Sequence, residues 1–291
     1  MASSPCAAAA APCAGQIAFL NHIMAVVDRR TADAVPGSIL LRRYASLEIR
    51  TTRSYGNGAW TGRYVNGPRN YLELFGPGDS GDESPVGSLG VALGGDVPGV
   101  TAKINARLRR AGVQGETRTM HRTFAGRDVP WFSGVGIAHP LTPAHGPTIE
   151  AWTMEFQPEF FAAAEAQRPP SQGPRDAVSR RRYLANLYKD TPIADIRRVE
   201  IAVPEQAYHR NVRPLLRAAG FCLKETSTVA SAKGGEAEVA IRFVAPGMTR
   251  LLRIDFALSR PVSGVEQERI GHSILRIGPG KTATWRFGML P

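Results

Sequence analysis

Cysteine is scarce in this sequence, with three in 291 residues: Cys6, Cys13 and Cys222. An odd number cannot all pair within one chain, and two of the three lie in a leader rich in Ala, Pro and Ser. Cysteine usage of this kind predicts neither a disulfide framework nor a cysteine-based zinc site. It fits a protein of a reducing compartment, and we expect a cytoplasmic location.

Long hydrophobic runs are also missing. No stretch of about eighteen uninterrupted apolar residues occurs, which argues against a membrane-spanning helix. The first fifteen residues contain a short alanine run but lack the basic start and the Leu- and Val-rich stretch of a secretory signal. We therefore expect a soluble protein with a disordered tail over residues 1–15.

Acidic residues are in the minority, and the net charge is +11. Clustered basic side chains would favour nucleic acid, because neutralised phosphates release counterions. The arginines are instead scattered from Arg29 to Arg286 in small groups. The densest group, Arg180–Arg182, is interpreted as a solvated helix start. The composition therefore does not favour a nucleic-acid-binding protein.

Several catalytic fingerprints are absent. The sequence has no Ser-His-Asp order, no phosphate-binding glycine loop and no dinucleotide motif, and GDSGDE at Gly78–Glu83 lacks the spacing of a calcium loop. These absences argue against nicotinamide-dependent and ATP-dependent chemistry.

A repeated pattern is present. Ser88–Val113 and Ile196–Phe221 each read as an apolar strand, a proline in the first helical turn and a helix that ends at a glycine. The two helix ends, LRRAGV and LRAAGF, match in character, and this argues for duplication. Pro214 lies within the second helix and is predicted to kink it or to shift its start.

The first unit has the same order, read as β-α-β-β-β from residues 16 to 75. Its strands are expected at 16–28, 47–54, 60–65 and 70–75, around a helix within 31–44. The second unit adds strands at 115–124, 131–137 and 148–157, and the last third has strands near 221–229, 238–243 and 251–258 and a hairpin about Gly278–Gly280.

These patterns predict an α+β fold. Paired β-α-β-β-β modules over residues 16–164, divided into 16–80 and 86–164, should form a curved mixed sheet. A Pro-, Gln- and Ser-rich linker is placed at 165–182, and a third, related α/β module at 183–291.

The order of these units, with a first strand like FLNHIMAVVD, a fourth like NYLELFGPG and helices that end in LRRAG, resembles the vicinal oxygen chelate superfamily of glyoxalases, extradiol dioxygenases and bleomycin-resistance proteins. More narrowly, the LNH start and the segments WTGRYVNGPRNYLELF, VPWF and WTMEF resemble an uncharacterised bacterial family of unknown function. The resemblance to the vicinal oxygen chelate superfamily covers residues 16–157. In the last third of the chain it rests only on the helix ending LRAAGF.

The superfamily implies a metal in the cup between two paired units, with ligands from the first and fourth strands of each. Carried over by position, these ligands are His22, Glu73 and Glu155, with Glu150 as a substitute for the last. The fourth position, near Gly90 or Val91, holds no ligating side chain.

The residue types alone also suit a metal. One imidazole and two carboxylates suit Fe, Mn, Ni or Zn and leave coordination sites open for substrate. Each residue has an ordinary alternative: His22 as a core histidine bonded to backbone, Glu73 as a solvent-facing carboxylate, and Glu155 as the partner of Arg63 or Arg122 in a salt bridge.

Further residues complete the predicted cup. His121 and Arg122 on a strand of the second unit are catalytic candidates, with His121 as a fourth ligand or general base and a surface or pocket-lining role as the alternative. Arg63, Trp131 and Trp152 are predicted to line the substrate pocket, although aromatic residues on strands are commonly core.

Two functions remain open. The first is a metal-dependent enzyme that acts on a small oxygen-rich molecule by isomerase, lyase or oxygenase chemistry. The second is a metal-free small-molecule binding or resistance protein that uses the same cup. We expect a small-molecule partner, no nucleic acid and no membrane, with a homodimer left open.

Overall fold

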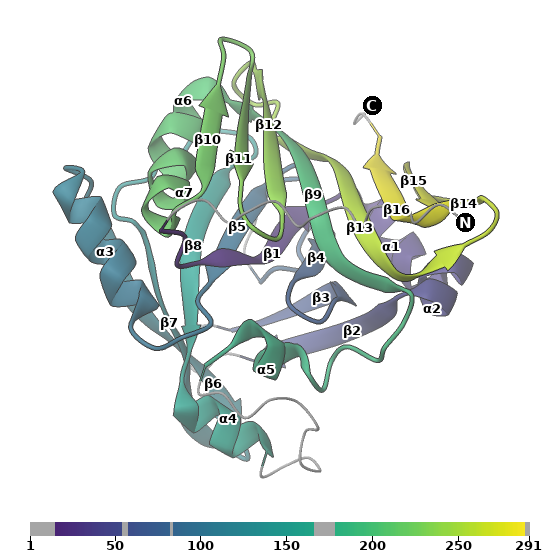
Figure 1. Cartoon of the computed structure of the whole chain (residues 1–291), viewed down its shortest axis with the longest axis horizontal. Helices are drawn as coiled ribbons and strands as arrows, with labels where there is room; N and C mark the ends of the chain where they lie inside the picture. The colour runs from purple at the N-terminus through teal and green to yellow at the C-terminus, as the bar shows by residue number, and fades with distance from the viewer. Residues whose placement is uncertain (1–14, 54–57, 82–83, 166–177, 289–291) are drawn as a thin grey trace, which may run out of the picture.

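The computed structural model of the chain describes residues 15–53, 58–81, 84–165 and 178–288. Over these residues the fold is α+β and is built on two eight-stranded mixed sheets, called here sheet A and sheet B. Figure 1 shows the two sheets side by side, with most helices at the margins. Residues 1–14, most of the expected tail, and 166–177, most of the expected linker, lie outside the described residues.

Sheet A comes from the first half of the chain, in the strand order β2-β3-β4-β1-β5-β8-β7-β6. Its first unit consists of β1 (Phe19–Val26), α1 (Arg29–Ala34), the 3-10 helix η1 (Val35–Gly37), α2 (Ile39–Tyr44), β2 (Ser46–Arg53), β3 (Ala59–Asn66) and β4 (Tyr71–Phe75). Its second unit consists of β5 (Leu89–Gly94), α3 (Val100–Arg110), β6 (Gly115–Phe124), β7 (Arg127–Ile137) and β8 (Ile149–Phe156), followed by α4 (Pro158–Glu165).

The pairing within sheet A confirms the predicted units. In each unit the first strand pairs in parallel with the fourth, β1 with β4 and β5 with β8. The two units are joined by antiparallel pairing of β1 with β5. This arrangement of paired β-α-β-β-β modules is the one that the resemblance to vicinal oxygen chelate proteins predicts.

Sheet B comes from the second half, in the order β10-β11-β12-β9-β13-β16-β15-β14. Helix α5 (Arg180–Leu184) precedes β9 (Ile193–Pro204), α6 (Glu205–Ala207), the π-helix η2 (Tyr208–Val212), α7 (Arg213–Ala219), β10 (Cys222–Glu225), β11 (Val229–Lys233) and β12 (Glu238–Val244). Then follow β13 (Arg250–Val262), β14 (Glu266–Ile270), β15 (Ser273–Ile277) and β16 (Gly280–Phe287).

The third unit expected from the sequence is β9 to β12 with its helices. Strands β13 to β16 repeat the strand order of a unit, and no helix lies between β13 and β14. The predicted strand at 251–258 and the hairpin about Gly278–Gly280 belong to this fourth set. The prediction for Pro214 is confirmed, because a π-helix precedes α7 and the proline lies in the first turn of α7.

The two sheets share one apolar core. A single cluster of buried side chains runs from Ala18 in the first unit to Trp285 in β16. At the ends of the sheets, α3 packs against α7, and Arg107 of α3 donates to the carbonyl oxygen of Ala218 over 2.9 Å. The halves therefore form one packed body.

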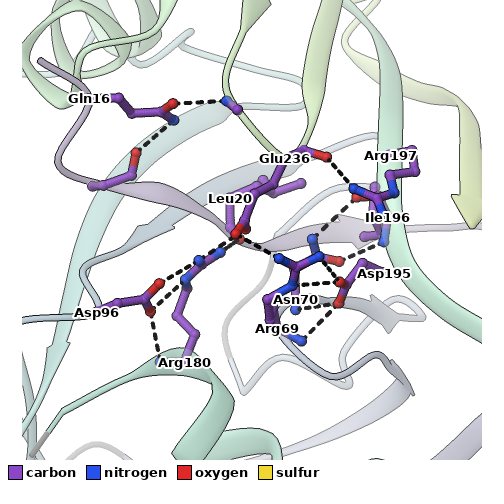
Figure 2. Close-up of polar contacts among 12 residues, drawn as sticks. Gln16, Leu20, Arg69, Asn70, Asp96, Arg180, Asp195, Ile196, Arg197 and Glu236 are labelled. Carbon is purple, nitrogen blue, oxygen red and sulfur yellow. Dashed lines mark hydrogen bonds and ion pairs between the residues drawn. The ribbon is translucent and has the colours of Figure 1, made fainter. Parts of the chain in front are cut away.

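A buried polar network also joins the halves (Figure 2). Arg180 of α5 is fully buried and donates to both carboxylate oxygens of Asp96, at 2.9 and 2.7 Å, and to the carbonyl oxygen of Leu20 at 2.8 Å. Glu236 lies 3.0 Å from Arg180 and 2.9 Å from Arg69. The interpretation of this arginine as part of a solvated helix start is wrong, since the first arginine of the run turns inward.

Cysteine pairing also differs from expectation. Cys222 at the start of β10 is disulfide-bonded, whereas the sequence predicted no disulfide, because cysteine spacing does not reveal which segments folding brings together. Cys6 and Cys13 lie outside the described residues. In the part of the chain that the structure describes, no helix is long and apolar enough to cross a membrane.

Candidate ligand-binding site

A cavity of about 530 Å³ opens on one face of sheet A. Strand alternation decides which residues reach it, because successive side chains point to opposite faces. Its lining accordingly takes alternate residues from β1 and β4, namely His22 and Met24, and Tyr71, Glu73 and Phe75, and it also includes the consecutive residues Glu150–Met154 of β8. Further walls come from Arg50, Trp60, Tyr64, Met120, Trp131, Phe132 and Tyr183.

His22 lies in the middle of β1 and is 3% exposed. Its ring stacks on Tyr71 with centroids 4.5 Å apart, and its Nδ1 lies 2.8 Å from the amide oxygen of Asn21. Because an amide oxygen can only accept, Nδ1 donates and the lone pair is on Nε2. Burial lowers the pKa of His22 to about 3, so the imidazole is neutral at physiological pH.

Glu73 on β4 is the partner of this imidazole. Its Oε2 lies 3.6 Å from His22 Nε2, longer than a hydrogen bond. Burial raises the pKa of Glu73 to about 7, although hydrogen bonds from Tyr64 and Trp60 and the charge of Arg50 act in the opposite direction. A carboxyl group with such a pKa can both release and accept a proton near neutral pH, which is the property of a general acid or base.

The second unit presents no matching donors on β5. His22 pairs across β1 and β5 with Ala92, and Met24 pairs with Gly90, so these two residues face the same side of the sheet as His22. A methyl group and a hydrogen cannot ligate a metal. The position near Gly90 therefore offers no ligating side chain on the face of His22.

On β8 the cavity face is also mainly apolar. Ala92 pairs with Trp152, and the indole ring lies at 5.5 Å from the His22 ring, edge to face. A Cβ atom at Gly90 would lie 2.5 Å from this indole, so the glycine makes room for it. Met154 follows on the same face, and Glu150 precedes on it with an exposed side chain.

Glu155, the predicted third ligand, points to the opposite face of β8. Its carboxylate accepts hydrogen bonds from the backbone N–H groups of Gly99 at 2.7 Å and Thr101 at 2.9 Å, at the start of α3. A carboxylate in this place satisfies free N–H groups and the helix dipole. The structure therefore does not bring Glu155 to His22 and Glu73, and its place is that of a helix cap.

The donor set does not fit the divalent metal that the superfamily implies. Zinc sites and the facial-triad iron sites take at least three protein ligands. Among the described residues, no group of three His, Cys, Asp or Glu side chains could hold a metal ion. In this part of the chain, His22 and Glu73 form a pair that no third His, Cys, Asp or Glu side chain joins.

The remaining predicted residues divide between the cavity and other places. Trp131 and Trp152 line the cavity. Arg63, on the other face of β3 from Tyr64, forms ion pairs with Asp79 at 2.6 Å and Asp33 at 3.6 Å and is not among the lining residues.

The two catalytic candidates on β6 lie outside the lining set. His121 is half exposed and lies 2.8 Å from a carboxylate oxygen of Asp128, across the β6–β7 hairpin. The guanidinium group of Arg122 lies 5.0 Å from the centre of the Trp131 ring and so covers this indole.

Sequence reasoning missed Arg50, Trp60 and Tyr183 as cavity residues. Trp60 shares strand parity with Tyr64, and this could have placed it on the same face. No sequence signal places Tyr183, which comes from α5 and stacks on Phe156 with ring centroids 4.2 Å apart.

Comparisons with known proteins give a fold and a family. A crystal structure of a hypothetical protein from Staphylococcus aureus has a TM-score of 0.52 at 11% identity and covers 90% of this chain and 99% of that one. The Mn(II)-bound glyoxalase from Novosphingobium aromaticivorans has a TM-score of 0.41 at 13% identity and covers 94% of this chain and 85% of that one. An extradiol ring-cleaving dioxygenase from B. fuscum has a TM-score of 0.40 at 14% identity and covers 82% of this chain and 56% of that one.

The first likeness shows the fold alone, and the two weaker ones carry no argument about the site. None of the curated proteins matches the chain. The model of a family described as "Family of unknown function (DUF5829)" matches residues 20–287.

Proposed function

The chain belongs to the DUF5829 family, and we propose that it binds a small organic molecule in the cavity of sheet A without a protein-held metal. One observation carries the proposal. The second-unit residues that pair with His22 and Met24 are Ala92 and Gly90, which have no metal-ligating atom, and the cavity nevertheless has a volume of about 530 Å³.

The size and walls of the cavity support this function. Small-molecule sites in proteins typically enclose about 300–1,000 Å³ and combine apolar walls with a few polar groups. Here three tryptophans, Trp60, Trp131 and Trp152, supply broad apolar surfaces, and His22 and Glu73 form a polar end. Large rings on rigid strands bury much ligand surface and lose little conformational entropy on binding.

Metal-dependent isomerase, lyase or oxygenase chemistry has less support, because His22 and Glu73 are two donors where such sites take three. Metal analysis of protein purified without chelator is a direct test. We expect less than stoichiometric Fe, Mn, Ni or Zn in the wild type and the same content in His22→Ala. A stoichiometric metal that the variant loses would restore the metal-dependent enzyme as the better account.

A fragment screen by ligand-observed NMR tests binding in the cavity. Met24 is partly exposed and lines the cavity, so Met24→Trp should extend into it and displace the ligand. Val265, 49% exposed and in sheet B's β13–β14 connection, gives the matched control Val265→Trp. Hits should bind the wild type and Val265→Trp and lose at least about tenfold in affinity for Met24→Trp. Equal binding to a folded Met24→Trp would place the ligand elsewhere.

A further inference from the structure

The cavity contains donors without acceptors. In the described part of the chain, the Nε atom of Arg50 and the Nε1 atom of Trp131 are buried and have no hydrogen-bond partner. Both residues line the cavity, and Trp131 is only 7% exposed. A buried donor without an acceptor costs free energy that a ligand oxygen can recover on binding.

Arg50 has a counter-ion, but it engages only one end of the guanidinium group. Its NH1 donates to Glu48 over 3.0 Å, and the guanidinium carbon lies 4.3 Å from the centre of the Tyr64 ring. The Tyr64 ring beneath Arg50 continues through Tyr71 and Tyr183 to Trp131, with successive ring centroids 6.0, 6.4 and 6.5 Å apart. The two unpartnered donors therefore border one aromatic wall of the cavity.

Two of the aromatic rings that line the cavity already face a cation. The Tyr64 ring is covered by the guanidinium group of Arg50, and Trp131 by that of Arg122 at 5.0 Å. Cation–π binding needs a free ring face, and a second positive charge beside either guanidinium group is repelled.

Building on the proposed function, we propose that the ligand is a flat, largely apolar molecule with one anionic group of acceptor oxygens, of the carboxylate type, which lies at the Arg50 and Trp131 side of the cavity. Its apolar body packs on the tryptophan walls. Its oxygens accept from the guanidinium and indole N–H groups, and hydrogen bonds of this charge-assisted kind are the stronger ones.

Three probes with one ring system and different head groups test the inference: 2-naphthoate, 2-naphthamide and 2-naphthylmethylammonium, each titrated by calorimetry into the full chain. We expect 2-naphthoate to bind about tenfold or more tightly than the amide, and the ammonium compound to bind weakest. In Arg50→Met the preference for naphthoate over naphthamide should vanish, and naphthamide affinity should stay within about threefold.

Control variants distinguish the loss of a ligand contact at Arg50 from a general loss of folding. Arg242→Met removes an exposed guanidinium group of sheet B that pairs with Glu200 and should leave the preference intact. Trp131→Phe keeps a ring but removes the N–H donor, and should reduce the preference. Retained naphthamide binding shows that Arg50→Met is folded.

The outcomes distinguish the two proposals. Binding of all three probes with equal affinity, or tightest binding of the ammonium compound, would overturn the anionic head group and leave the cavity as a binding site. A loss of naphthoate and naphthamide affinity by the same factor in Arg50→Met would also overturn it. Absence of binding by every probe at millimolar concentration would count against both proposals.

Discussion

Replacement of Glu73 by glutamine should change how stability depends on pH. The folded-state pKa of Glu73 is about 7, against an ordinary value of 4.5, and burial is the main cause. Between these two values the folded chain holds the proton more tightly than the unfolded chain does. The contribution of this group to stability is therefore fully present below about pH 4.5 and is lost as the pH rises through 7.

The magnitude follows from the shift. About 2.5 pKa units at about 1.4 kcal/mol each give a loss of about 3 kcal/mol in the unfolding free energy between pH 4.5 and pH 8. Glutamine cannot ionise, so Glu73→Gln should avoid this loss. The glutamine amide has only one acceptor oxygen, so it can lose a hydrogen bond from Tyr64 or Trp60. This loss lowers the unfolding free energy by an amount that does not depend on pH.

Urea unfolding followed by circular dichroism at pH 5, 6, 7 and 8 measures the effect. The unfolding free energy of Glu73→Gln minus that of the wild type should increase by about 2.5 kcal/mol from pH 5 to pH 8, and titrating groups common to both chains cancel in this difference. A difference that stays constant over the range would show that Glu73 is ionised at pH 5 and would refute the reasoning from burial.

Three further predictions concern stability and helix capping. Arg180→Met should lower the unfolding free energy by about 1–3 kcal/mol in urea denaturation, because the partly exposed carboxylates of Asp96 and Glu236 and the carbonyl oxygen of Leu20 lose their donor, whereas exposed Arg181→Met should change it little. Glu155→Ala should cost about 1 kcal/mol and increase hydrogen exchange at the start of α3, and unchanged exchange there would contradict the capping role. Gly90→Ala should cost about 1–3 kcal/mol, measured by thermal unfolding, because its Cβ would be 2.5 Å from an indole atom, and Gly136→Ala, with 3.6 Å to its nearest neighbour, is the control that should be milder.

The order of strands and helices could be predicted because apolar alternation and glycine helix ends are local signals. Every strand predicted in the first two units is present within a few residues. The prediction of which β8 side chains face the cavity is inconsistent with itself. Trp152 and Glu155 are an odd number of residues apart on one strand and so cannot both face the cavity. Alternation fixes which residues share a face, and only packing against α3 decides which face is outside.

The parts that could not be predicted depend on distant partners. Arg180 is buried because Asp96 and Glu236 meet it from positions far away in the chain. Tyr183 enters the cavity on the same short helix, beyond a segment whose composition only indicated a linker. The repeat formed by β13 to β16 could not be predicted, because the signal for a repeat is a helix that ends at a glycine and this set contains no helix.

The pairing of His22 with Ala92 shows that the two structurally similar units present different chemical groups to the cavity face. The two units meet at β1 and β5, and the cavity spans this seam. The buried ionisable groups His22 and Glu73 come from the first unit, and the second unit contributes the buried side chains of Ala151 and Met154 to the lining. A ligand therefore meets different groups at the two ends of the cavity, and its two possible orientations differ in energy unless its own two ends are identical.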